Sequence, residues 1–196
     1  DSAFVIAHIG SGASLAAVLN GQSVDTTMGF TPLDGIVMCT RAGSVDPAII
    51  PYMMDRLGES AEEIIDDLNH RSGLLGMSGF SSDQREVSAA ATKGDEKSAI
   101  AMETLAYSIA KNIAAMMVAL PRVDALVFTA GAGENASGLR AGIVDHLKVF
   151  NYQIDKDQNR RIRGRNGLDG VISEKDTPVI MAIRTNEELV IAEETE

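Results

Sequence analysis

The chain has 196 residues, of which 45% are apolar and 23% are charged, as in an ordinary globular protein rather than a disordered one. Its 28 Asp and Glu against 17 Lys and Arg leave a net charge of −11, which disfavours binding to nucleic acid or to a membrane surface. No apolar run approaches the ~20 residues of a membrane span, and the single cysteine excludes an internal disulfide. Nothing at the N-terminus has the pattern of a signal peptide, so we expect a cytoplasmic protein.

Three strands are predicted at the start of the chain. Apolar residues follow an extended pattern over residues 4–9, 13–19 and 22–27. The glycine-rich turn Gly10-Ser11-Gly12 joins the first two, and Asn20-Gly21, a pair typical of tight hairpins, joins the next two. We therefore expect an antiparallel, three-stranded unit.

Two helices are predicted next. Asp46 and Pro47 indicate a helix start, with Asp46 as the N-cap and Pro47 at the first helical position. The apolar face of this helix would consist of Ile49, Ile50, Met53, Met54 and Leu57, and Gly58 would end it. Ser60 and Glu63 form a capping-box pattern that opens a second, short helix through Asn69.

The rest of the chain alternates helices with buried strands. Residues 72–82 are rich in Gly and Ser and predict a loop, and residues 95–120 predict the longest helix, with apolar residues spaced by three or four. There follow a strand over 125–129, a helix over 137–150, a polar stretch over 155–176, a strand over 179–183 and a helix capped by Asn186. This order predicts one α/β domain over residues 1–196, a mixed β-sheet flanked by helices.

Two glycine-rich turns are candidate binding sites. The turn Gly10-Ser11-Gly12 either offers backbone N–H groups to phosphate oxygens or is a hairpin that needs glycine for its backbone angles. The segment from Gly131 to Ala136 follows a strand and matches G-x-G-x-x-A, the pattern of a dinucleotide site. The same turn could equally hold an adenosine or its phosphates.

Several charged residues each allow two interpretations. Arg41 is either a mobile surface charge or a phosphate clamp. Asp83 and Arg85 form either a local ion pair or an acceptor and a donor fork for a ligand. Glu187 and Glu188 are explained either by the dipole of the helix that follows Asn186 or by Mg²⁺ binding.

The remaining polar residues favour structural roles. Arg160, Arg161, Arg163 and Arg165 predict a solvated surface loop. His8 lies on an apolar strand as a structural histidine, whereas His70 and His146 are expected to face solvent, and Cys39 to be a small buried residue.

Taken together and in this order, several stretches closely resemble the acetate kinase family, which belongs to the actin-like ATPase superfamily. The matching stretches are residues 8–14, 23–33, 40–43 with 46–50, 72–75 with 78–79 and 81–85, 128–135 and 185–192. The resemblance implies an actin-like (ribonuclease H-like) fold and covers the C-terminal half of the family. In the family that half forms the nucleotide-binding side of the cleft and carries most of the dimer interface, so a homodimer is expected.

The resemblance also assigns roles to individual residues. It implies that the nucleotide phosphates contact His8, Ile9, Gly10, Ser11 and Gly12. The adenosine would be surrounded by Asp83, Gln84, Arg85, Gly131, Ala132, Gly133, Glu134 and Asn135. Arg41 would stabilise the transferring phosphoryl group, and Glu187 would help to bind Mg²⁺. Ser11 stands where the family usually has Asn, and its shorter side chain reaches less far toward a γ-phosphate, while Cys39 stands where the family usually has Gly, in the loop that aims Arg41.

The function that follows is transfer of the ATP γ-phosphoryl group to acetate or propionate, reversibly, by the nucleotide-binding half of a kinase. The family's N-terminal half supplies the catalytic Asp and the acetate-binding Arg, so we expect this chain alone to be inactive or very slow. The alternatives are a non-catalytic dimerisation or nucleotide-sensing paralogue and, on Gly131–Ala136 alone, a small dinucleotide-binding protein.

Overall fold

The computed structural model describes residues 1–185 and contains a six-stranded mixed β-sheet. Its strands are β1 (Ala3–Ile9), β2 (Ala13–Leu19), β3 (Gln22–Thr26), β4 (Ala125–Thr129), β5 (Gly170–Val171) and β6 (Ile180–Ala182). They lie in the order β3-β2-β1-β4-β6-β5. The first three strands are antiparallel, β4 and β6 run parallel to β1, and β5 returns antiparallel at the edge. The predicted mixed sheet is confirmed.

The N-terminal hairpins follow the sequence closely. Asn20 and Gly21 both have positive φ, 50° and 78°, as the primed turn between β2 and β3 requires. Burial alternates along β1 and β2, because one face of this antiparallel pair packs on the core. Every residue of β3 is exposed, and this edge strand ends at Thr26, one residue earlier than predicted.

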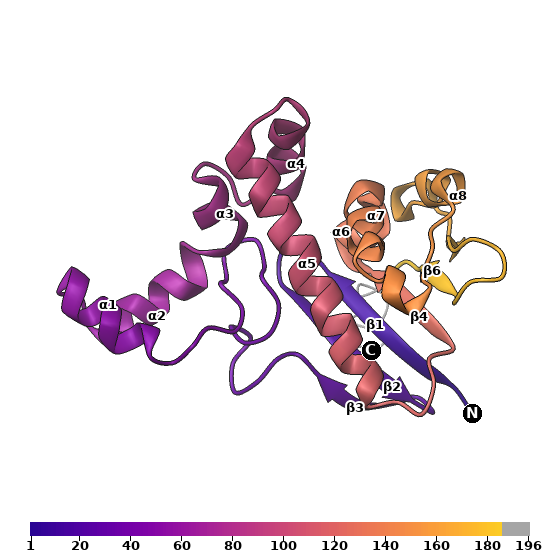
Figure 1. Cartoon of the computed structure of the whole chain (residues 1–196), viewed down its shortest axis with the longest axis horizontal. Helices are drawn as coiled ribbons and strands as arrows, with labels where there is room; N and C mark the ends of the chain where they lie inside the picture. The colour runs from indigo at the N-terminus through magenta and orange to yellow at the C-terminus, as the bar shows by residue number, and fades with distance from the viewer. Residues whose placement is uncertain (186–196) are drawn as a thin grey trace, which may run out of the picture.

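Helices surround the sheet. They are α1 (Ile49–Leu57), α2 (Ala61–His70), α3 (Gly73–Ser78), α4 (Gln84–Thr92), α5 (Glu96–Val118), α6 (Ala130–Asn135), α7 (Ser137–Asp145) and α8 (Lys156–Arg161), with 3₁₀ turns η1 (Lys148–Phe150) and η2 (Gly164–Asn166). The long helix α5 crosses one face of the sheet and contacts β1, β2 and α7 (Figure 1). Helices α1 and α2 extend to one side of the molecule, and α6, α7 and α8 lie on the other.

The core lies between α5 and the sheet. Leu105, Ile109 and Ile113 form the buried stripe that the spacing of α5 predicts. All five residues of β4 are buried, as expected of a central strand with neighbours on both sides. The helix predicted over residues 95–120 is present as α5, and its N-cap is Asp95, whose carboxylate accepts the Ser98 N–H at 2.8 Å.

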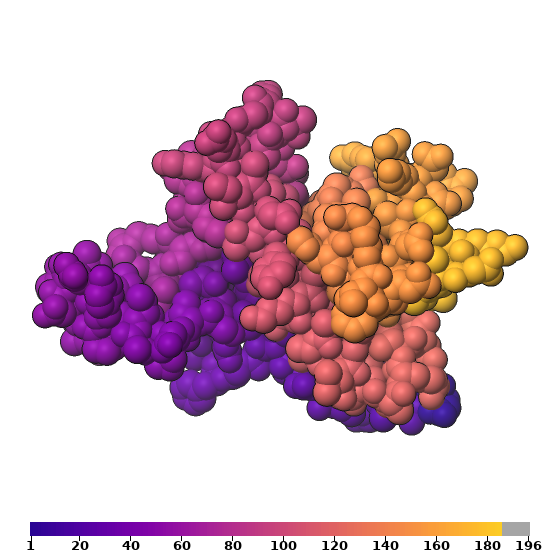
Figure 2. Space-filling view, in the orientation of Figure 1, coloured from indigo at the N-terminus to yellow at the C-terminus, as the bar shows by residue number. Residues whose placement is uncertain are grey.

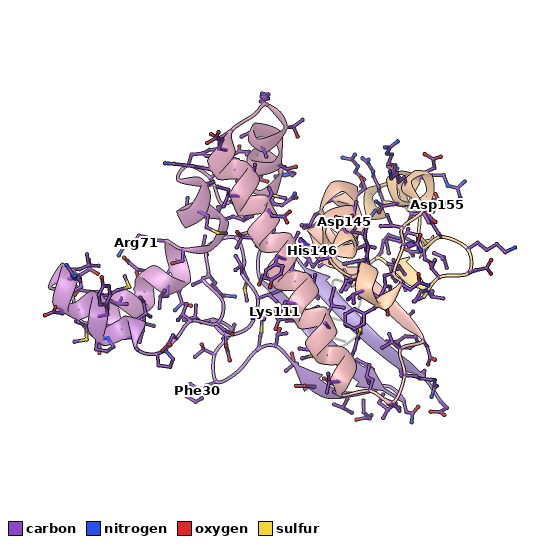
Figure 3. The ribbon with its side chains drawn as sticks, viewed as in Figure 1. Phe30, Arg71, Lys111, Asp145, His146 and Asp155 are labelled. Atoms are coloured by element: carbon purple, nitrogen blue, oxygen red, sulfur yellow. The ribbon has the colours of Figure 1, made fainter. Side chains whose placement is uncertain are left out.

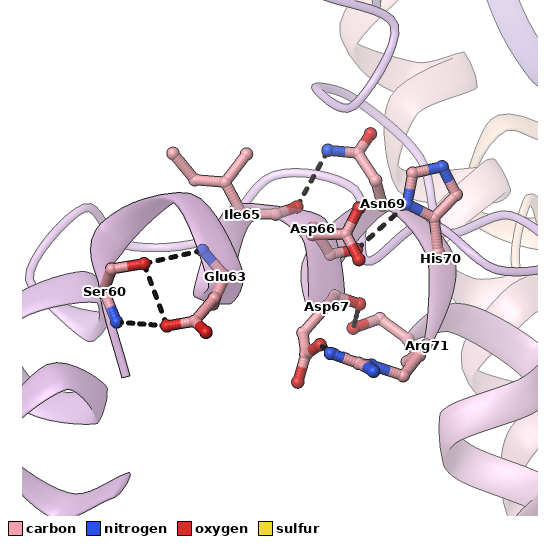
Figure 4. Close-up of polar contacts among 9 residues, drawn as sticks. Ser60, Glu63, Ile65, Asp66, Asp67, Asn69, His70 and Arg71 are labelled. Carbon is pink, nitrogen blue, oxygen red and sulfur yellow. Dashed lines mark hydrogen bonds and ion pairs between the residues drawn. The ribbon is translucent and has the colours of Figure 1, made fainter. Parts of the chain in front are cut away.

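Helix α2 has the predicted capping box (Figure 4). The Ser60 hydroxyl accepts the Glu63 N–H, and the Glu63 carboxylate accepts the Ser60 N–H at 2.8 Å. These hydrogen bonds hold the pKa of Glu63 below its ordinary value. Toward the end of the helix Asp66 pairs with His70, which is exposed as predicted. Ser60 and Glu63 were therefore sufficient to predict where α2 begins.

The predicted start of α1 is wrong, and its predicted apolar face is not buried. The helix begins at Ile49 rather than at Pro47, because the Asp46 carboxylate accepts the Ala48 N–H and closes a turn first. No residue of α1 is buried, although its apolar residues have helical spacing. The helix extends from the body of the molecule and packs on α2 rather than on the sheet (Figure 1).

The predicted loop over residues 72–82 contains a helix. Gly73 begins α3 with a φ of 58°, and the N–H groups of Leu74 and Leu75 donate to the carbonyls of Met38 and Cys39 at 3.0 Å. These are contacts with a distant segment, which local composition does not reveal. Further along, the predicted helix over 137–150 ends at Asp145 and continues only as the turn η1.

Two ring-bearing side chains, His146 and Phe30, differ in exposure (Figure 3). His146 is half-buried rather than in solvent, with its Nε2 3.0 Å from a carboxylate oxygen of Glu103 and its ring against the edge of Tyr107. Phe30, in the loop after β3, is fully exposed. No helix within residues 1–185 is long and apolar enough to cross a membrane.

Candidate functional site

A cavity of about 780 Å³ lies where five separate segments meet, a volume suited to a small-molecule ligand. Its walls are Gly10, Ser11, Cys39, Thr40, Ser82, Asp83, Gln84, Arg85, Gly131, Ala132, Asn135, Ala136 and Arg165. Figure 2 shows the molecule hollowed between the part that carries α3 and α4 and the orange part that carries α6 to α8. Eight of the predicted site residues are therefore brought together.

The turn between β1 and β2 forms one wall. The Gly10 N–H donates to the Gly12 carbonyl at 3.1 Å, and a Cβ added at Gly10 would lie only 3.1 Å from that same oxygen. Neither glycine has a positive φ. The turn therefore needs glycine for close approach and not for unusual backbone angles, which corrects one of the two predicted interpretations. Ser11 is exposed at its tip and faces the cavity.

Two predicted phosphate contacts on β1 lie deeper. Ile9 is 3% exposed and its side chain belongs to the core, so only its backbone is available to a ligand at the cavity. His8 is half-buried on β1, between Ser14 on β2 and Thr129 on β4. Neither lines the 780 Å³ cavity.

Arg41 lies beside the glycine turn. Its Nη1 would be 3.4 Å from a Cβ added at Gly12, and it contacts the Met38 sulfur at 3.7 Å. Within residues 1–185 it has no carboxylate partner. Backbone hydrogen bonds from Ala42 N–H to the Leu68 carbonyl and from Met38 N–H to the Arg41 carbonyl fix its loop. Arg41 is thus a held, half-buried cation with free donors, as a phosphate clamp requires.

Asp83 and Arg85 occupy the opposite wall at the start of α4. The Asp83 carboxylate caps α4 by accepting the Arg85 N–H at 2.8 Å, and it also accepts two donors of the Arg85 guanidinium. These bonds hold the pKa of Asp83 at about 2. The predicted ion pair is therefore present, and both residues line the cavity as well. The two interpretations of this pair do not exclude each other.

The glycine segment after β4 is a helix, α6, rather than an open turn. Ala130 has a φ of 63°, and this left-handed residue turns the chain directly from strand into helix. Asn135 donates to the Gly131 carbonyl at 3.0 Å, and its Oδ1 accepts the Arg165 N–H. Gly131, Ala132 and Asn135 face the cavity.

Two other residues of this segment point elsewhere. Gly133 is buried, and a Cβ there would lie 3.5 Å from the Ala7 carbonyl oxygen. The Glu134 carboxylate accepts the N–H and hydroxyl of Thr185, both at 2.8 Å, at the end of β6. Both residues support the wall without lining it.

Cavity residues that the sequence did not single out for a ligand come from three segments. They are Cys39, Thr40, Ser82 and Arg165, and Ala136, the last residue of the predicted G-x-G-x-x-A segment, lines the cavity as well. Of the four arginines predicted on a solvated surface loop, Arg160 and Arg161 are exposed but lie on helix α8. Arg165 is exposed on the turn η2, as predicted, and it also lines the cavity. Cys39 is half-buried rather than buried, and burial, with a smaller contribution from Asp83, raises the pKa of its thiol.

The described part of the cavity holds no cluster of metal-ligating side chains. Within residues 1–185 no three His, Cys, Asp or Glu side chains are grouped to hold a metal ion. Asp83, the carboxylate in the wall, is occupied by Arg85. Glu187, the predicted Mg²⁺ ligand, and the helix predicted after Asn186 lie outside the described residues.

Comparison with known proteins gives one family. A profile of the Acetokinase family matches residues 1–193. The acetate kinase of Thermoanaerobacterium thermosaccharolyticum is 45% identical over 194 residues, which cover 98% of this chain and 48% of that protein. The acetate kinase of Pseudothermotoga lettingae is 45% identical over 196 residues, covering 100% and 47%. The chain spans about half the length of these curated relatives.

Solved structures agree with the sequence relatives. A propionate kinase from Francisella tularensis superposes with a TM-score of 0.92 at 44% identity, over 99% of this chain and 49% of that one. The acetate kinase of Porphyromonas gingivalis gives a TM-score of 0.91 at 37% identity, over 99% and 48%. The predicted actin-like α/β fold is confirmed by these likenesses together with the mixed sheet.

Proposed function

Because the chain belongs to the acetokinase family, we propose that it forms the nucleotide-binding half of a short-chain carboxylate kinase. The reaction is transfer of the ATP γ-phosphoryl group to acetate or propionate, which gives the acyl phosphate and ADP and is reversible. The observation that carries the proposal is the cavity walled by the β1–β2 glycine turn, the start of α4 and the start of α6. Resemblance to the family assigns these same stretches to binding of the nucleotide phosphates and the adenosine.

The chemistry needs little more than positioning and positive charge. Phosphoryl transfer passes through a loose transition state whose negative charge spreads over the phosphoryl oxygens, so held cations supply much of the catalysis. Arg41 has the required features, since it is anchored beside Gly12 and has no carboxylate partner within residues 1–185. Its planar fork suits phosphate oxygens. We assign Arg41 to the transferring phosphoryl group.

Mg²⁺ bound to the nucleotide would neutralise phosphate charge. Glu187 is the proposed Mg²⁺ ligand, because the family resemblance assigns this carboxylate to the metal. Carboxylate oxygens are ligands that Mg²⁺ accepts. Asp83 does not serve, since Arg85 already occupies both of its oxygens. The carboxylic acid substrate belongs to the half of the kinase that this chain does not match, so acetate and propionate remain equal candidates.

Calorimetric titration with MgADP tests the nucleotide site, with NAD as the control ligand. We expect saturable heat with MgADP, none with NAD, and weaker MgADP binding in Arg85→Ala. Absence of MgADP binding would contradict the proposal. Heat with NAD that competes with ADP would support the dinucleotide-binding alternative instead.

Recombination tests the catalytic part. The chain is mixed with the separately expressed N-terminal half of a relative such as the acetate kinase of Thermoanaerobacterium thermosaccharolyticum. Acetyl phosphate formation is then followed by trapping with hydroxylamine. We expect activity that neither half shows alone and that Arg41→Ala abolishes. A folded complex that binds MgADP but forms no acyl phosphate would support the non-catalytic dimerisation or nucleotide-sensing paralogue.

A further inference from the structure

Arg140 on α7 is completely buried, which is exceptional for a charged side chain. All five of its N–H groups donate hydrogen bonds of 2.7 to 3.1 Å, to Asn159 Oδ1 and to the backbone carbonyls of Gly133, Glu134, Asn159 and Ile162. None of these acceptors is a carboxylate. Burial, and to a smaller extent Arg163, lowers the pKa of Arg140 to about 10, so it stays charged at neutral pH.

The acceptors of Arg140 belong to two walls of the cavity. Gly133 and Glu134 are part of α6, whose Gly131, Ala132 and Asn135 face the cavity. The other acceptors lie on α8 and just after it, a few residues before Arg165, which also faces the cavity. A further bond, from the Arg165 N–H to Asn135 Oδ1 at 3.0 Å, joins the two walls directly. Arg140 itself does not line the cavity.

A buried cation without a counter-ion is a poor source of stability, because desolvation of the charge opposes its hydrogen bonds. What the guanidinium provides is a rigid, planar set of five donors with fixed directions. This planar fork holds the carbonyls of α6 and those of residues 159–162 at a fixed distance from one another. The geometry points to Arg140 as a positioning residue for nucleotide binding, one that sets α6 against the segment that carries Arg165. This assignment rests on the proposed nucleotide site.

Arg140→Lys tests the assignment, since Lys keeps the charge but replaces the fork with three donors on one atom. MgADP affinity and amide hydrogen exchange are measured well below the unfolding temperature of each variant. We expect MgADP to bind at least about tenfold more weakly and amide exchange to accelerate only within residues 130–137 and 159–166. Arg122→Lys is the matched control, because Arg122 also uses several donors of its fork, here to the Asp124 carboxylate and the Asp1 carbonyl, but lies before β4 and does not line the cavity. It should lower stability without changing MgADP affinity.

Asn159 provides a second test that leaves Arg140 in place. Asn159→Asp and Asn159→Leu both remove the amide donor to the Ser137 carbonyl, but only Asn159→Leu removes the acceptor of Arg140 Nε. We expect wild-type affinity for MgADP in Asn159→Asp and a loss of severalfold in Asn159→Leu.

Folded variants Arg140→Lys and Asn159→Leu that bind MgADP within twofold of the wild type would overturn the assignment. Equal losses in both Asn159 variants would overturn it too, since the Arg140 contact would then be irrelevant. If Arg140→Lys does not fold, the Asn159 pair decides. If the wild-type chain binds no MgADP, the proposed function fails, and the exchange pattern alone decides whether Arg140 orders the two walls.

Discussion

Arg165 lines the cavity although it belongs to none of the predicted binding motifs. Its guanidinium has no hydrogen-bond or ion-pair partner within residues 1–185, and its backbone N–H holds it against Asn135. A cation in a cavity wall with free donors is suited to an anionic ligand or to the face of an adenine ring.

Arg165→Gln should therefore weaken MgADP binding by about 1.5 to 3 kcal/mol, the range for one hydrogen bond to a charged group. The matched control is Arg161→Gln, which makes the same change on the exposed side of α8. Calorimetry on both variants measures the difference. Equal affinities in the two variants would show that Arg165 only forms part of the wall.

Cys39 offers a chemical probe of the cavity because it is the only cysteine of the chain. The pKa of its thiol is raised by burial and by Asp83, and only the thiolate reacts with alkylating reagents. We expect iodoacetamide to react with Cys39 more slowly than with a free thiol at pH 7. The rate should rise with pH only at higher pH than the rate of a free thiol does, because the raised pKa of Cys39 delays formation of the thiolate. Saturating MgADP should protect the thiol, whereas NAD should not. A rate that MgADP leaves unchanged would place the nucleotide away from Cys39.

At the scale of elements, α3 and the loop of Arg41 depend on each other. Gly73 has a φ of 58°, and a Cβ there would lie 2.3 Å from the Met38 carbonyl oxygen and 2.8 Å from that of Arg41. Both carbonyls belong to the loop that carries Arg41, whose guanidinium lies beside Gly12. A side chain at Gly73 would have to push this loop away.

Gly73→Ala should therefore destabilise the fold by at least about 2 kcal/mol, since backbone strain adds to a clash with backbone atoms. Gly79→Ala is the matched control, because Gly79 is also left-handed, with a φ of 78°, but has open space around its Cβ position. It should cost only about 1 kcal/mol. Urea denaturation of the two variants measures the difference. Similar losses of unfolding free energy in the two variants would show that close packing around Gly73 adds nothing to the cost of its backbone conformation.

Local chemistry explains which elements were predictable. The Asn20-Gly21 turn and the Ser60–Glu63 capping box each depend on residues within a few positions of one another, and both are present. Helix α3 was missed because its first N–H groups bond to carbonyls more than thirty residues earlier. The apolar face predicted for α1 is not buried, because helical spacing shows a face but not whether anything covers it.

At the scale of the whole molecule, apolar side chains on α1 and α2 are uncovered. Tyr52, Met54 and Leu57 on α1 and Ile65 on α2 are all at least 40% exposed. The family resemblance predicts a homodimer, and the long helix α5 also exposes the apolar side chains of Ile100, Tyr107 and Val118. The two surfaces give competing sites for self-association.

Sedimentation velocity distinguishes them. We expect the wild-type chain to dimerise and Leu57→Glu to shift it toward the monomer, because a charge in an apolar interface is desolvated without a partner. Val118→Glu, which introduces the same charge at a residue that is 87% exposed on α5, should leave the dimer unchanged. The reverse pattern would return the interface to α5, and a monomeric wild-type chain would contradict self-association altogether.

The sequence by itself determined the family, the mixed α/β fold, the N-terminal hairpins and eight of the residues that line the cavity. Those features are carried by short stretches whose turns, caps and periodicities act over a few residues. Only the tertiary structure decided that Arg165 and Cys39 face the cavity, that Ile9 and Glu134 do not, and that Arg140 is buried between two of its walls. Side-chain direction at such positions depends on contacts between segments far apart in the chain, which no local pattern records.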